Sequence, residues 1–393
     1  MYDITVVGAG PAGSFCAYLL AKEGFHVALI EKKSFPRKKL CGGGVSYKAV
    51  KLLDDIIDIT KLKGKALSGS YLSFKNEHLT HVGQNITSYS IEREEFDNEL
   101  LKAAKDAGVD VIIPHTVVSL EENSREVLIK LEDDSEVKSN FLVLAEGING
   151  KLFERIGYSG NRDITMALEI DVKPKEYPHN FNNNTLFDFG AIPKGYAWIF
   201  PKDGYLNVGA YYYRSRNIDR LQERALECFV NQFSWAKEAE IGKINGHALP
   251  YSIDYSSYNT NRTLLIGDSA GTVENFYGEG LYYGLQSSRL AEEEITNAIH
   301  NNASLDNFTK RLKSEILIQV KFSRITAHLF YPRQKFGYYK MVRNKLMNYY
   351  YAELIHGKIS QKKCYFYTMA SLPISIFSGK LSDRDFKEVG LLK

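Results

Sequence analysis

Residues 41–44 join one thiol to a run of three glycines, Cys-Gly-Gly-Gly. Glycine costs backbone entropy, so a run of it is typical of a loop that bends sharply or lies against a flat group. The thiol of Cys41 is then either reactive or a small buried hydrophobe. Two cations, Arg37 and Lys39, come shortly before it. The loop therefore predicts either a sharp bend or close contact with a flat group.

A second group of glycines has the spacing of a dinucleotide-binding turn. Gly8, Gly10 and Gly13 give G-x-G-x-x-G, and Glu31 lies 18 residues after Gly13. The first glycine permits a tight turn, the second lets backbone approach a pyrophosphate, and the third lets helix and strand pack closely. An acid about 20 residues further on accepts hydrogen bonds from a ribose. This pattern predicts phosphate binding at a helix N-terminus.

The elements expected around this turn are in register with it. An apolar strand over 4–7, a helix from about Pro11 to Glu23 and a strand over 27–30 flank the glycines. Gly24 suits the position that follows a helix. Because strand, helix, strand and acid occur in this order, the segment favours a Rossmann unit over a chance match.

Two later segments favour FAD over NAD as the cofactor. Residues 262–281 read as a strand ending in Gly267 and Asp268, then a loop and a helix; residues 140–151 read as a strand ending in a small-acid-glycine turn. In FAD proteins an Asp after a late strand takes the ribityl chain. The helix that follows directs its N-terminus at the flavin, where its dipole favours the reduced form. A nicotinamide, if used, has no second G-x-G-x-x-G unit of its own.

The bulk composition is that of a globular protein, with 44% hydrophobic and 25% charged residues. The net charge of +3 gives no case for nucleic-acid binding. The charge is uneven, because residues 331–393 hold 12 Lys and Arg against 4 Asp and Glu, together with many Tyr and Phe. A basic, aromatic tail indicates either contact with an anionic membrane surface or a solvated helical face.

Four cysteines, Cys16, Cys41, Cys228 and Cys364, lie far apart, which argues against a zinc site or a disulfide framework. We expect no metal. Met1 runs almost directly into an apolar strand, so no signal peptide is expected. The apolar stretch YTMASLPISIF is shorter than the roughly 20 residues of a membrane-spanning helix. These features predict a cytoplasmic protein, with a peripheral position on a membrane left open.

Four stretches together resemble the geranylgeranyl reductase family of flavoproteins. They are VVGAGPAG at 6–13, FPRKKLCGGGVS at 35–46, YAWIFPKDGYLNVGA at 196–210 and GDSAGTVENFYGEGL at 267–281. The first and last patterns occur across a wider class of flavoproteins, and the middle two narrow the likeness to this family. The likeness covers residues 1 to about 300.

The resemblance implies an α/β FAD-binding Rossmann-like domain of the glutathione-reductase and para-hydroxybenzoate-hydroxylase type. It implies an inserted antiparallel β-sheet substrate domain and a helical C-terminal region. The expected division gives 1–65, 84–160 and 260–300 to the FAD-binding domain and 66–83 and 161–259 to the substrate domain. Residues 301–393 then form the helical, basic C-terminal region.

The resemblance also assigns site residues. It places Cys41, Gly42 and Gly43 beside the flavin ring, as catalytic candidates. Arg93, which opens a helix expected to end at Gly108, would reach FAD, although a solvated Arg is the alternative. The full set of candidate cofactor-binding residues is Gly8, Gly10, Ala12, Gly13, Glu31, Lys32, Arg37, Cys41, Gly42, Gly43, Gly44, Arg93, Val117, Glu146, Gly147, Gly267, Asp268, Gly278, Gly280 and Leu281.

Two positions depart from the family pattern. Glu146 stands where the wider class has Asp, which leaves the role of this carboxylate open. Asn275 stands where the family has Pro, which leaves the rigidity of the loop before the G-E-G triplet open. Both departures lie in segments expected to contact the cofactor.

The segment 195–213 predicts a hairpin with strands over 195–200 and 205–213. Tyr196, Trp198 and Phe200 alternate along the first strand, so they share one face of a sheet. That face is either plain core or, by the resemblance, the wall of an apolar tunnel over the flavin. Candidate substrate-binding residues are Tyr196, Trp198, Phe200, Tyr277 and Gly278.

The implied activity is reduction of C=C bonds in a geranylgeranyl group by hydride transfer from reduced flavin N5 and protonation. The substrate would be a polyisoprenoid lipid, and the electron donor reduced ferredoxin or NADPH. Two alternatives remain at this point: a flavin-dependent monooxygenase or halogenase of the same fold, or a flavin-bound electron-transfer or lipid-binding protein. The sequence leaves the lipid, the proton donor and the oligomeric state open.

Overall fold

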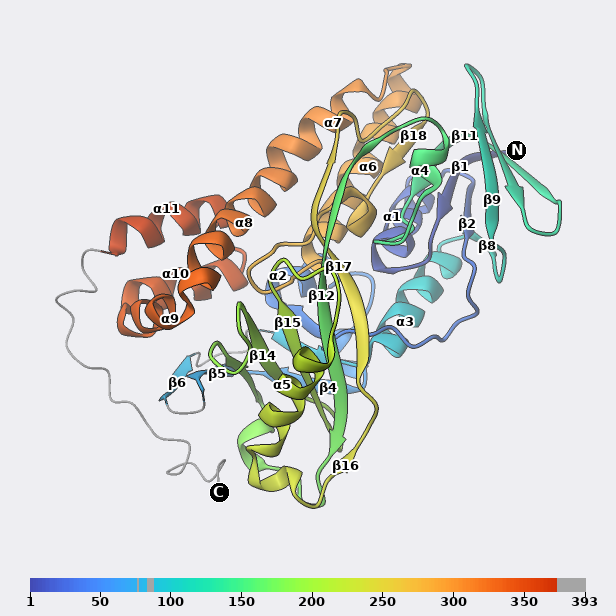
Figure 1. Cartoon of the computed structure of the whole chain (residues 1–393). Coiled ribbons are helices and arrows are strands. Elements are labelled where there is room, and N and C mark those ends of the chain that lie inside the picture. Colours follow the sequence, from blue (N-terminus) through green and yellow to red (C-terminus); the bar gives the residue numbers. More distant parts are fainter. Residues whose placement is uncertain (76–77, 83–87, 373–393) are drawn as a thin grey trace.

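The computed structural model describes residues 1–75, 78–82 and 88–372, with the backbone alone for 78–82. Three layers are visible in Figure 1: a sheet near the N-terminus, a larger sheet beside it, and a group of helices at the C-terminal end of the described chain. The predicted C-terminal region therefore lies partly outside the described residues, since it includes 373–393.

The first sheet combines a parallel core with an antiparallel edge. Parallel pairs give the order β8-β2-β1-β11-β18, and β10 and β9 continue antiparallel from β11. The strands are β1 (Tyr2–Val7), β2 (Val27–Ile30), β8 (Asp110–Ile112), β9 (Val117–Glu122), β10 (Val127–Leu131), β11 (Glu136–Leu144) and β18 (Thr263–Leu265). The accompanying helices are α1 (Pro11–Lys22), α3 (Arg93–Asp106), α4 (Leu152–Arg155) and α6 (Leu281–Asn301).

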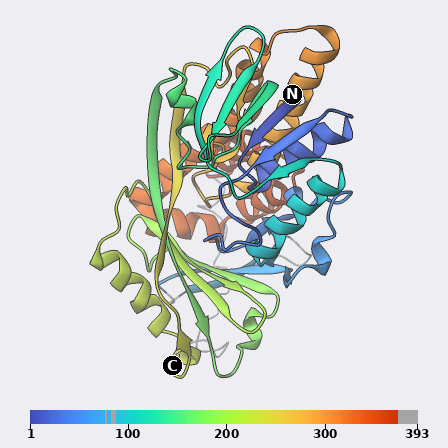
Figure 2. The same ribbon diagram turned by 90° about the vertical axis from the view of Figure 1, so that its right-hand side faces the viewer.

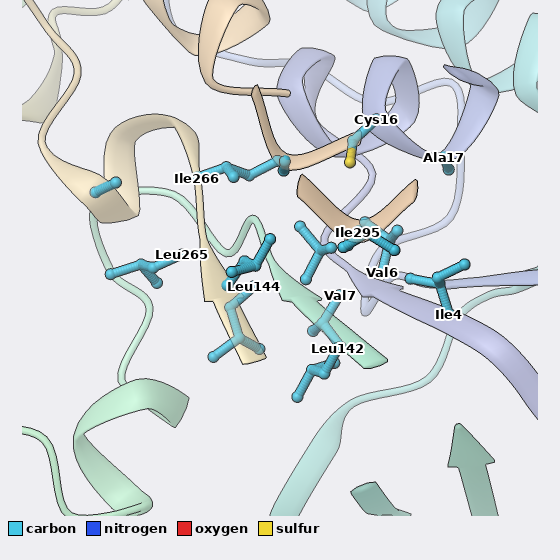
Figure 3. Close-up of a cluster of buried hydrophobic side chains, with 14 of the residues drawn as sticks. Ile4, Val6, Val7, Cys16, Ala17, Leu142, Leu144, Leu265, Ile266 and Ile295 are labelled. Carbon is cyan, nitrogen blue, oxygen red and sulfur yellow. The ribbon is translucent and has the colours of Figure 1, made fainter. Parts of the chain in front are cut away.

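The strands of this sheet have continuous apolar sequences because they are buried on both faces. Helices cover a parallel sheet on its faces, so both sides of each strand are buried. All four residues of β2 are buried. Figure 3 shows side chains of β1, β11 and α6 meeting in this core, with Cys16 of α1 among them. Cys16 is therefore a packing residue.

A small sheet connects the two larger ones. It consists of β3 (Gly44–Ser46), β7 (Ser88–Ile91) and β4 (Gly64–Leu67), in the order β3-β7-β4. The short helix α2 (Tyr47–Val50) follows β3 directly. The end of the Cys-Gly-Gly-Gly loop is thus fixed by pairing with β7.

The larger sheet has the order β16-β12-β15-β14-β13-β5-β6, with β17 also paired to β12. Its strands are β5 (Gly69–Phe74), β6 (His78–Val82), β12 (Gly160–Lys173), β13 (Asn184–Asp188), β14 (Gly195–Pro201), β15 (Leu206–Tyr212), β16 (Glu240–Ile241) and β17 (Asn245–Tyr255). The predicted hairpin is confirmed as β14 and β15. The expectation of antiparallel strands alone was wrong in two respects: β5 and β13 pair in parallel, and the helix α5 (Arg220–Asn231) interrupts the strands.

The two faces of the larger sheet have different partners. On the outer face α5 packs over a second hydrophobic core that also contacts Trp235, whose ring stacks on Phe233 with centroids 5.0 Å apart. Figure 2 shows α5 on this outer side. The inner face carries an aromatic cluster, made chiefly of Phe74, Phe189, Tyr196, Trp198, Tyr211, Tyr213, Phe276, Phe330, Tyr331 and Tyr338. This aromatic cluster joins the sheet to the C-terminal helices.

The C-terminal helices close over the aromatic cluster. They are α7 (Asp306–Arg311), α8 (Ile318–Phe330), α9 (Gln334–Arg343), α10 (Lys345–Ile355) and α11 (Gln361–Ser371). The side-chain amide of Gln334 donates to the carbonyls of Phe189, Ile192 and Gly195, which fixes α9 to the sheet. Within the described part of the chain, every helix is too short or too polar to span a membrane.

Candidate active site

The glycine turn after β1 leaves space for a ligand at one glycine and not at the others. A Cβ at Gly8, whose φ is +106°, would lie 2.4 Å from the carbonyl oxygen of Ala145, and one at Gly13 would lie 1.8 Å from the Gly8 oxygen. A Cβ at Gly10 would meet only the Arg37 guanidinium, at 4.0 Å, among the described residues. Gly8 and Gly13 are therefore required for packing. Gly10 leaves an open cradle that fits a pyrophosphate.

Glu31 stands at the end of β2 beside this cradle. Its carboxylate accepts hydrogen bonds from the backbone N–H groups of Ala9 and Lys33, both at 2.9 Å. Of the described side chains, none caps the N-terminus of α1 and none in its first turn is acidic. The free N–H groups of that turn can therefore take phosphate oxygens, and the carboxylate a ribose.

A second helix N-terminus lies next to the first. Ala12 of α1 contacts α6, because Ser288 donates a hydrogen bond to the Ala12 carbonyl at 2.8 Å. Asp268 follows β18, and burial raises its pKa while Lys39 and Arg93 oppose that rise. A Cβ at Gly280 would lie 3.2 Å from the Asp268 carboxylate. Gly267, Asp268, Gly280 and Leu281 thus gather where the sequence places the ribityl chain and flavin; their contact with FAD stays a prediction.

Asp97 of α3 joins two of the predicted cofactor cations. It is fully buried and forms a bidentate pair with Arg93, with N–O distances of 2.9 and 3.1 Å, and lies 3.4 Å from Arg37. Arg93 also lies within electrostatic range of the Cys41 thiol. Burial works to lower the pKa of Arg93, but Asp97 and Cys41 raise it overall. Arg93 is thus a fixed cation beside the thiol and not a solvated one.

The Cys-Gly-Gly-Gly loop lies against aromatic side chains of the larger sheet. A Cβ at Gly42 would stand 2.8 Å from the Phe200 ring and 3.3 Å from Nε1 of Trp198, and one at Gly44 would stand 2.8 Å from the same Phe200 ring. Gly43 has a φ of +74°, and its Cβ would lie 2.2 Å from the Ile91 carbonyl oxygen. Within the chain itself, the flat group that leaves no room for side chains at Gly42 and Gly44 is therefore the Phe200 ring.

Cys41 is exposed in the protein chain, so the alternative of a buried, inert thiol is wrong. Its sulfur accepts a hydrogen bond from the backbone N–H of Gly43 at 3.4 Å. Lys202, which is buried and donates to the Ile91 carbonyl at 2.6 Å, lies within electrostatic range of it. Any shielding of Cys41 must therefore come from a bound ligand.

Lys39 leads to a histidine that the sequence did not single out. Its ammonium lies 2.8 Å from Nε2 of His247 on β17. Burial, and then the charges of Lys39 and Arg93, lower the pKa of His247 to about 3. Burial and Arg93 also lower the pKa of Lys39. His247 is therefore neutral at physiological pH and cannot act as an acid there.

The predicted aromatic stripe faces the inner side of the sheet, as the alternation indicates. Tyr196 and Trp198 are 4% and 7% exposed and belong to the aromatic cluster, and Phe200 packs partly against it. The Tyr196 hydroxyl donates to the carbonyl of Tyr277, and a Cβ at Gly278 would lie 3.7 Å from that hydroxyl. The five substrate candidates thus lie together; their contact with substrate stays a prediction.

The remaining cofactor candidates have local roles. Glu146 accepts a hydrogen bond from Leu152 N–H at 3.1 Å, and burial raises its pKa while Lys32 works to lower it. Gly147, with a φ of +75°, completes that turn. The side chain of Val117 is buried in the core of the first sheet, so its backbone alone could meet a ligand.

Besides Asp97 and His247, sequence reasoning missed three further groups around this site: Lys202, Glu169 of β12 and Glu274. Lys202 occupies the hairpin turn, where a lysine is normally solvated. Glu274 is 4% exposed and accepts hydrogen bonds from the N–H groups of Phe276, Tyr277 and Glu279, so it shapes the loop that contains Asn275. Glu274 could have been found from its position between the G-D-x-A-G and G-E-G motifs. The burial of Lys202 and Glu169 depends on contacts with residues that are distant in the sequence.

Comparison with known proteins agrees with this geometry. The family described as FAD binding domain matches residues 1–310. An uncharacterized protein of Methanosarcina barkeri is 35% identical, covering 84% of each chain. A menaquinone reductase of Mycobacterium tuberculosis is 30% identical over 74% of this chain and 76% of its own. A digeranylgeranylglycerophospholipid reductase of Methanopyrus kandleri is 28% identical over 79% and 84%.

Solved structures support the fold. A geranylgeranyl bacteriochlorophyll reductase-like protein of Thermoplasma acidophilum matches with a TM-score of 0.77 and 20% identity, covering 99% of both chains. A flavin-dependent brominase matches with a TM-score of 0.78 and 19% identity, over 96% of this chain and 98% of its own. Because these identities are low, both structures speak for a shared architecture and not for a shared substrate.

Proposed function

Because the chain belongs to the geranylgeranyl reductase family of FAD-binding flavoproteins, and is an FAD-dependent oxidoreductase, we propose that it saturates C=C bonds in the isoprenoid chain of a lipid. Two of its named relatives are reductases of lipids, a menaquinone and a digeranylgeranylglycerophospholipid. The chain spans about three quarters or more of these relatives. The substrate class we propose is therefore a polyisoprenoid attached to a polar head.

One observation carries this proposal: the Cys-Gly-Gly-Gly loop and the aromatic wall are in direct contact. Gly42 lies against both Trp198 and Phe200. A group held at the Cys-Gly-Gly-Gly loop is thus next to a wide apolar surface, which suits an isoprenoid because it offers carbon surface and few polar groups. Burial of that surface contributes about 25 cal/mol per Å².

The residues of the chain supply binding, orientation and exclusion of water. Reduced FAD, when bound, supplies a hydride equivalent. The Gly10 cradle and Glu31 would hold its pyrophosphate and ribose, and Asp268 with the N-terminus of α6 would hold the ribityl and flavin end. Trp198 and the surrounding rings would keep an alkene close to that end and away from water. Positioning of this kind can provide much of the rate for an unactivated double bond.

The test is a single-turnover reaction under anaerobic conditions. Protein reconstituted with FAD is photoreduced and mixed with a geranylgeranyl lipid, and in parallel with menaquinone. We expect flavin reoxidation together with products that carry two added hydrogens per double bond, measured by mass spectrometry. Reoxidation that requires oxygen and leaves the lipid unchanged would instead indicate an oxygenase.

The electron donor is part of the same proposal. The described chain shows one dinucleotide-binding turn, at Gly8 to Gly13, and we assign that turn to the flavin cofactor. We therefore propose that reduced ferredoxin or transiently bound NADPH delivers electrons. Steady-state turnover with each donor, compared with photoreduction, distinguishes the two.

We also propose that the C-terminal helices contact a lipid surface. Phe336, Tyr349, Phe366 and Tyr367 are exposed on α9, α10 and α11. Residues 331–372 hold eight Lys and Arg side chains against one Glu. Aromatic rings and cations together favour the surface of an anionic membrane.

A further inference from the structure

Two carboxyl groups share the inner face of the larger sheet with Trp198. Trp198 of β14 is paired with Gly209 of β15, and Gly209 with Glu169 of β12. In the next row on this face, Phe200, Asn207 and Asp171 occupy the same three strands. Since alternate residues of a strand share a face, Glu169 and Asp171 belong to the same wall as the aromatic stripe.

Gly209 allows the indole of Trp198 to lie over the middle strand. A Cβ at Gly209 would stand 2.0 Å from Cζ2 of Trp198, a distance at which no side chain fits. No side chain therefore stands between Trp198 and Glu169 in this row. The carboxyl group of Glu169 is the next functional group along the wall from the indole.

Asn207 connects the indole to the carboxyl group of Asp171. The indole N–H of Trp198 donates to Oδ1 of Asn207 at 3.0 Å, and Nδ2 of Asn207 donates to Asp171 at 3.0 Å. Asn207 also lies close enough to Glu169 to lower the pKa of that carboxyl group. The same Trp198 Nε1 is the atom that a Cβ at Gly42 would approach to 3.3 Å. The carboxyl pair is thus tied to the edge of Trp198 that meets the Cys-Gly-Gly-Gly loop.

The charges that face Glu169 come from its own strand, from the hairpin turn and from the loop before β3. Asp171 lies on its own strand, Lys202 in the hairpin turn, and Lys39 before the Cys-Gly-Gly-Gly loop. Burial and then Asp171 raise the pKa of Glu169 to about 7, against the opposing effects of Lys202, Asn207 and Lys39. Glu169 is therefore mostly protonated below about pH 7 and mostly ionised above it.

Other titratable groups of this wall are less suited to release a proton. His247 is neutral at pH 7, as its pKa of about 3 requires. Burial raises the pKa of Tyr196 and Tyr277 far above their usual value. These groups hold their position in the site, and their protons are not available at neutral pH.

We propose that Glu169 is the catalytic acid that supplies the proton for reduction of the double bond. This inference rests on the proposed function. One alkene carbon accepts the hydride that reduced FAD supplies, and the π electrons form a new C–H bond between the other carbon and the proton of Glu169. The carboxyl O–H bond breaks and a carboxylate remains, while the cofactor is oxidised by two electrons.

The surroundings of Glu169 fit the rest of this cycle. The cation of Lys202 lies close enough to stabilise the carboxylate that forms. Asp171 is exposed, so water can return a proton to the pair after each turnover. Proton donation by a positioned carboxyl group contributes about 100-fold to 10,000-fold to a rate.

The test uses Glu169→Gln in the single-turnover assay with photoreduced, FAD-loaded protein and a geranylgeranyl lipid. We expect FAD affinity to stay at the wild-type value and double-bond reduction to slow about 100-fold or more. The wild-type rate should fall as pH rises through about 7, because the protonated form is active. The residual rate of the variant should not show this dependence.

Asp171→Asn provides a second measurement with the hydrogen-bond acceptor retained. The Asp171 charge raises the pKa of Glu169, so its removal should move the fall in rate to lower pH. A wild-type rate without a pH transition, or Glu169→Gln with the wild-type rate and profile, would overturn this proposal and leave the reductase function intact. Wild-type protein that reduces no prenyl lipid would overturn the function itself.

Discussion

At the scale of single residues, two glycines of the turn are needed for different reasons. Gly13 is required for packing, and Gly10 leaves the space that we assign to the cofactor. Gly13→Ala would place a methyl group 1.8 Å from the Gly8 oxygen, so we expect a loss of about 1–3 kcal/mol in the free energy of unfolding of the apo protein. Gly10→Ala meets open space in the chain, so the apo protein should melt at the wild-type temperature. It should bind FAD at least tenfold more weakly, which corresponds to about 1.4 kcal/mol.

Thermal unfolding without FAD and titration with FAD measure the two effects separately. Equal behaviour of the two variants in both assays would mean that Gly10 does not face the pyrophosphate.

Cys41 allows a direct test of where the cofactor lies. The thiols of Cys41 and Cys228 are exposed, whereas Cys16 and Cys364 are buried. In a Cys228→Ser background we expect an alkylating reagent to modify Cys41 rapidly in the apo protein and slowly in the FAD-loaded protein. Mass spectrometry of the labelled protein measures the difference. Labelling that is indifferent to FAD would place the flavin away from the Cys-Gly-Gly-Gly loop.

Cys41→Ser addresses the role of the thiol itself. The hydroxyl keeps nearly the same size but is a far weaker acid, so FAD binding should survive and reduction should slow or reach fewer double bonds. If rate and product pattern stay unchanged, the thiol has no part in the reaction and the three glycines are the functional part of the loop.

At the scale of elements, the loop between η4 (Gly267–Ala270) and α6 depends on one buried carboxylate. Glu274 accepts three backbone hydrogen bonds within the loop and one from Ser323 of α8. Because Glu274→Ala leaves these donors unpaired, we expect a loss of about 3 kcal/mol in stability and weaker FAD binding. Ser323→Ala removes the hydroxyl that donates to Glu274. That hydroxyl also accepts from the N–H groups of Asn275 and Phe276, so we expect a loss of about 1–2 kcal/mol. Chemical denaturation measures both, and equal losses would show that the loop is held by other contacts.

The sequence predicts elements well where their pattern is local. The strand, turn and helix from Tyr2 to Lys22 follow from glycine spacing and apolar periodicity, and the hairpin of β14 and β15 follows from alternation. Helix α5 was missed although Asp219 and Gln222 form a capping box at its start. The helix lies between strands of the larger sheet, and the patterns of those strands predict further strands across the whole segment.

The site was predictable as far as its groups belong to motifs. Gly10, Glu31 and Cys41 lie in short patterns, and the structure brings their neighbours together as expected. Glu169 and Lys202 do not belong to such a pattern. Their burial and their charged surroundings depend on the pairing of β12 with β15 and on neighbours that are distant in the sequence. From the pattern of one strand alone, a carboxylate such as that of Glu169 is expected to be solvated.

At the scale of the whole molecule, the C-terminal helices present cations and exposed rings together. We expect the protein to sediment with vesicles that contain an anionic phospholipid, less so at high salt, since each cation near the surface contributes about 1 kcal/mol. Lys362→Glu combined with Lys363→Glu on α11 should weaken binding at least tenfold. The same change at Lys102 and Lys105 of α3 is the matched control. Equal effects of the two pairs would mean that overall charge, and not this face, governs binding.

The two tryptophans of the chain stand on opposite faces of the larger sheet: Trp198 within the aromatic cluster and Trp235 against the hydrophobic core under α5. The molecule therefore carries its own pair of fluorophores, one at the site and one remote from it. A lipid that enters beside Trp198 should change the emission of that indole and leave Trp235 as an internal reference. Trp235→Phe should keep the response to lipid and Trp198→Phe should lose it, so that occupancy can be followed optically before any electron is delivered.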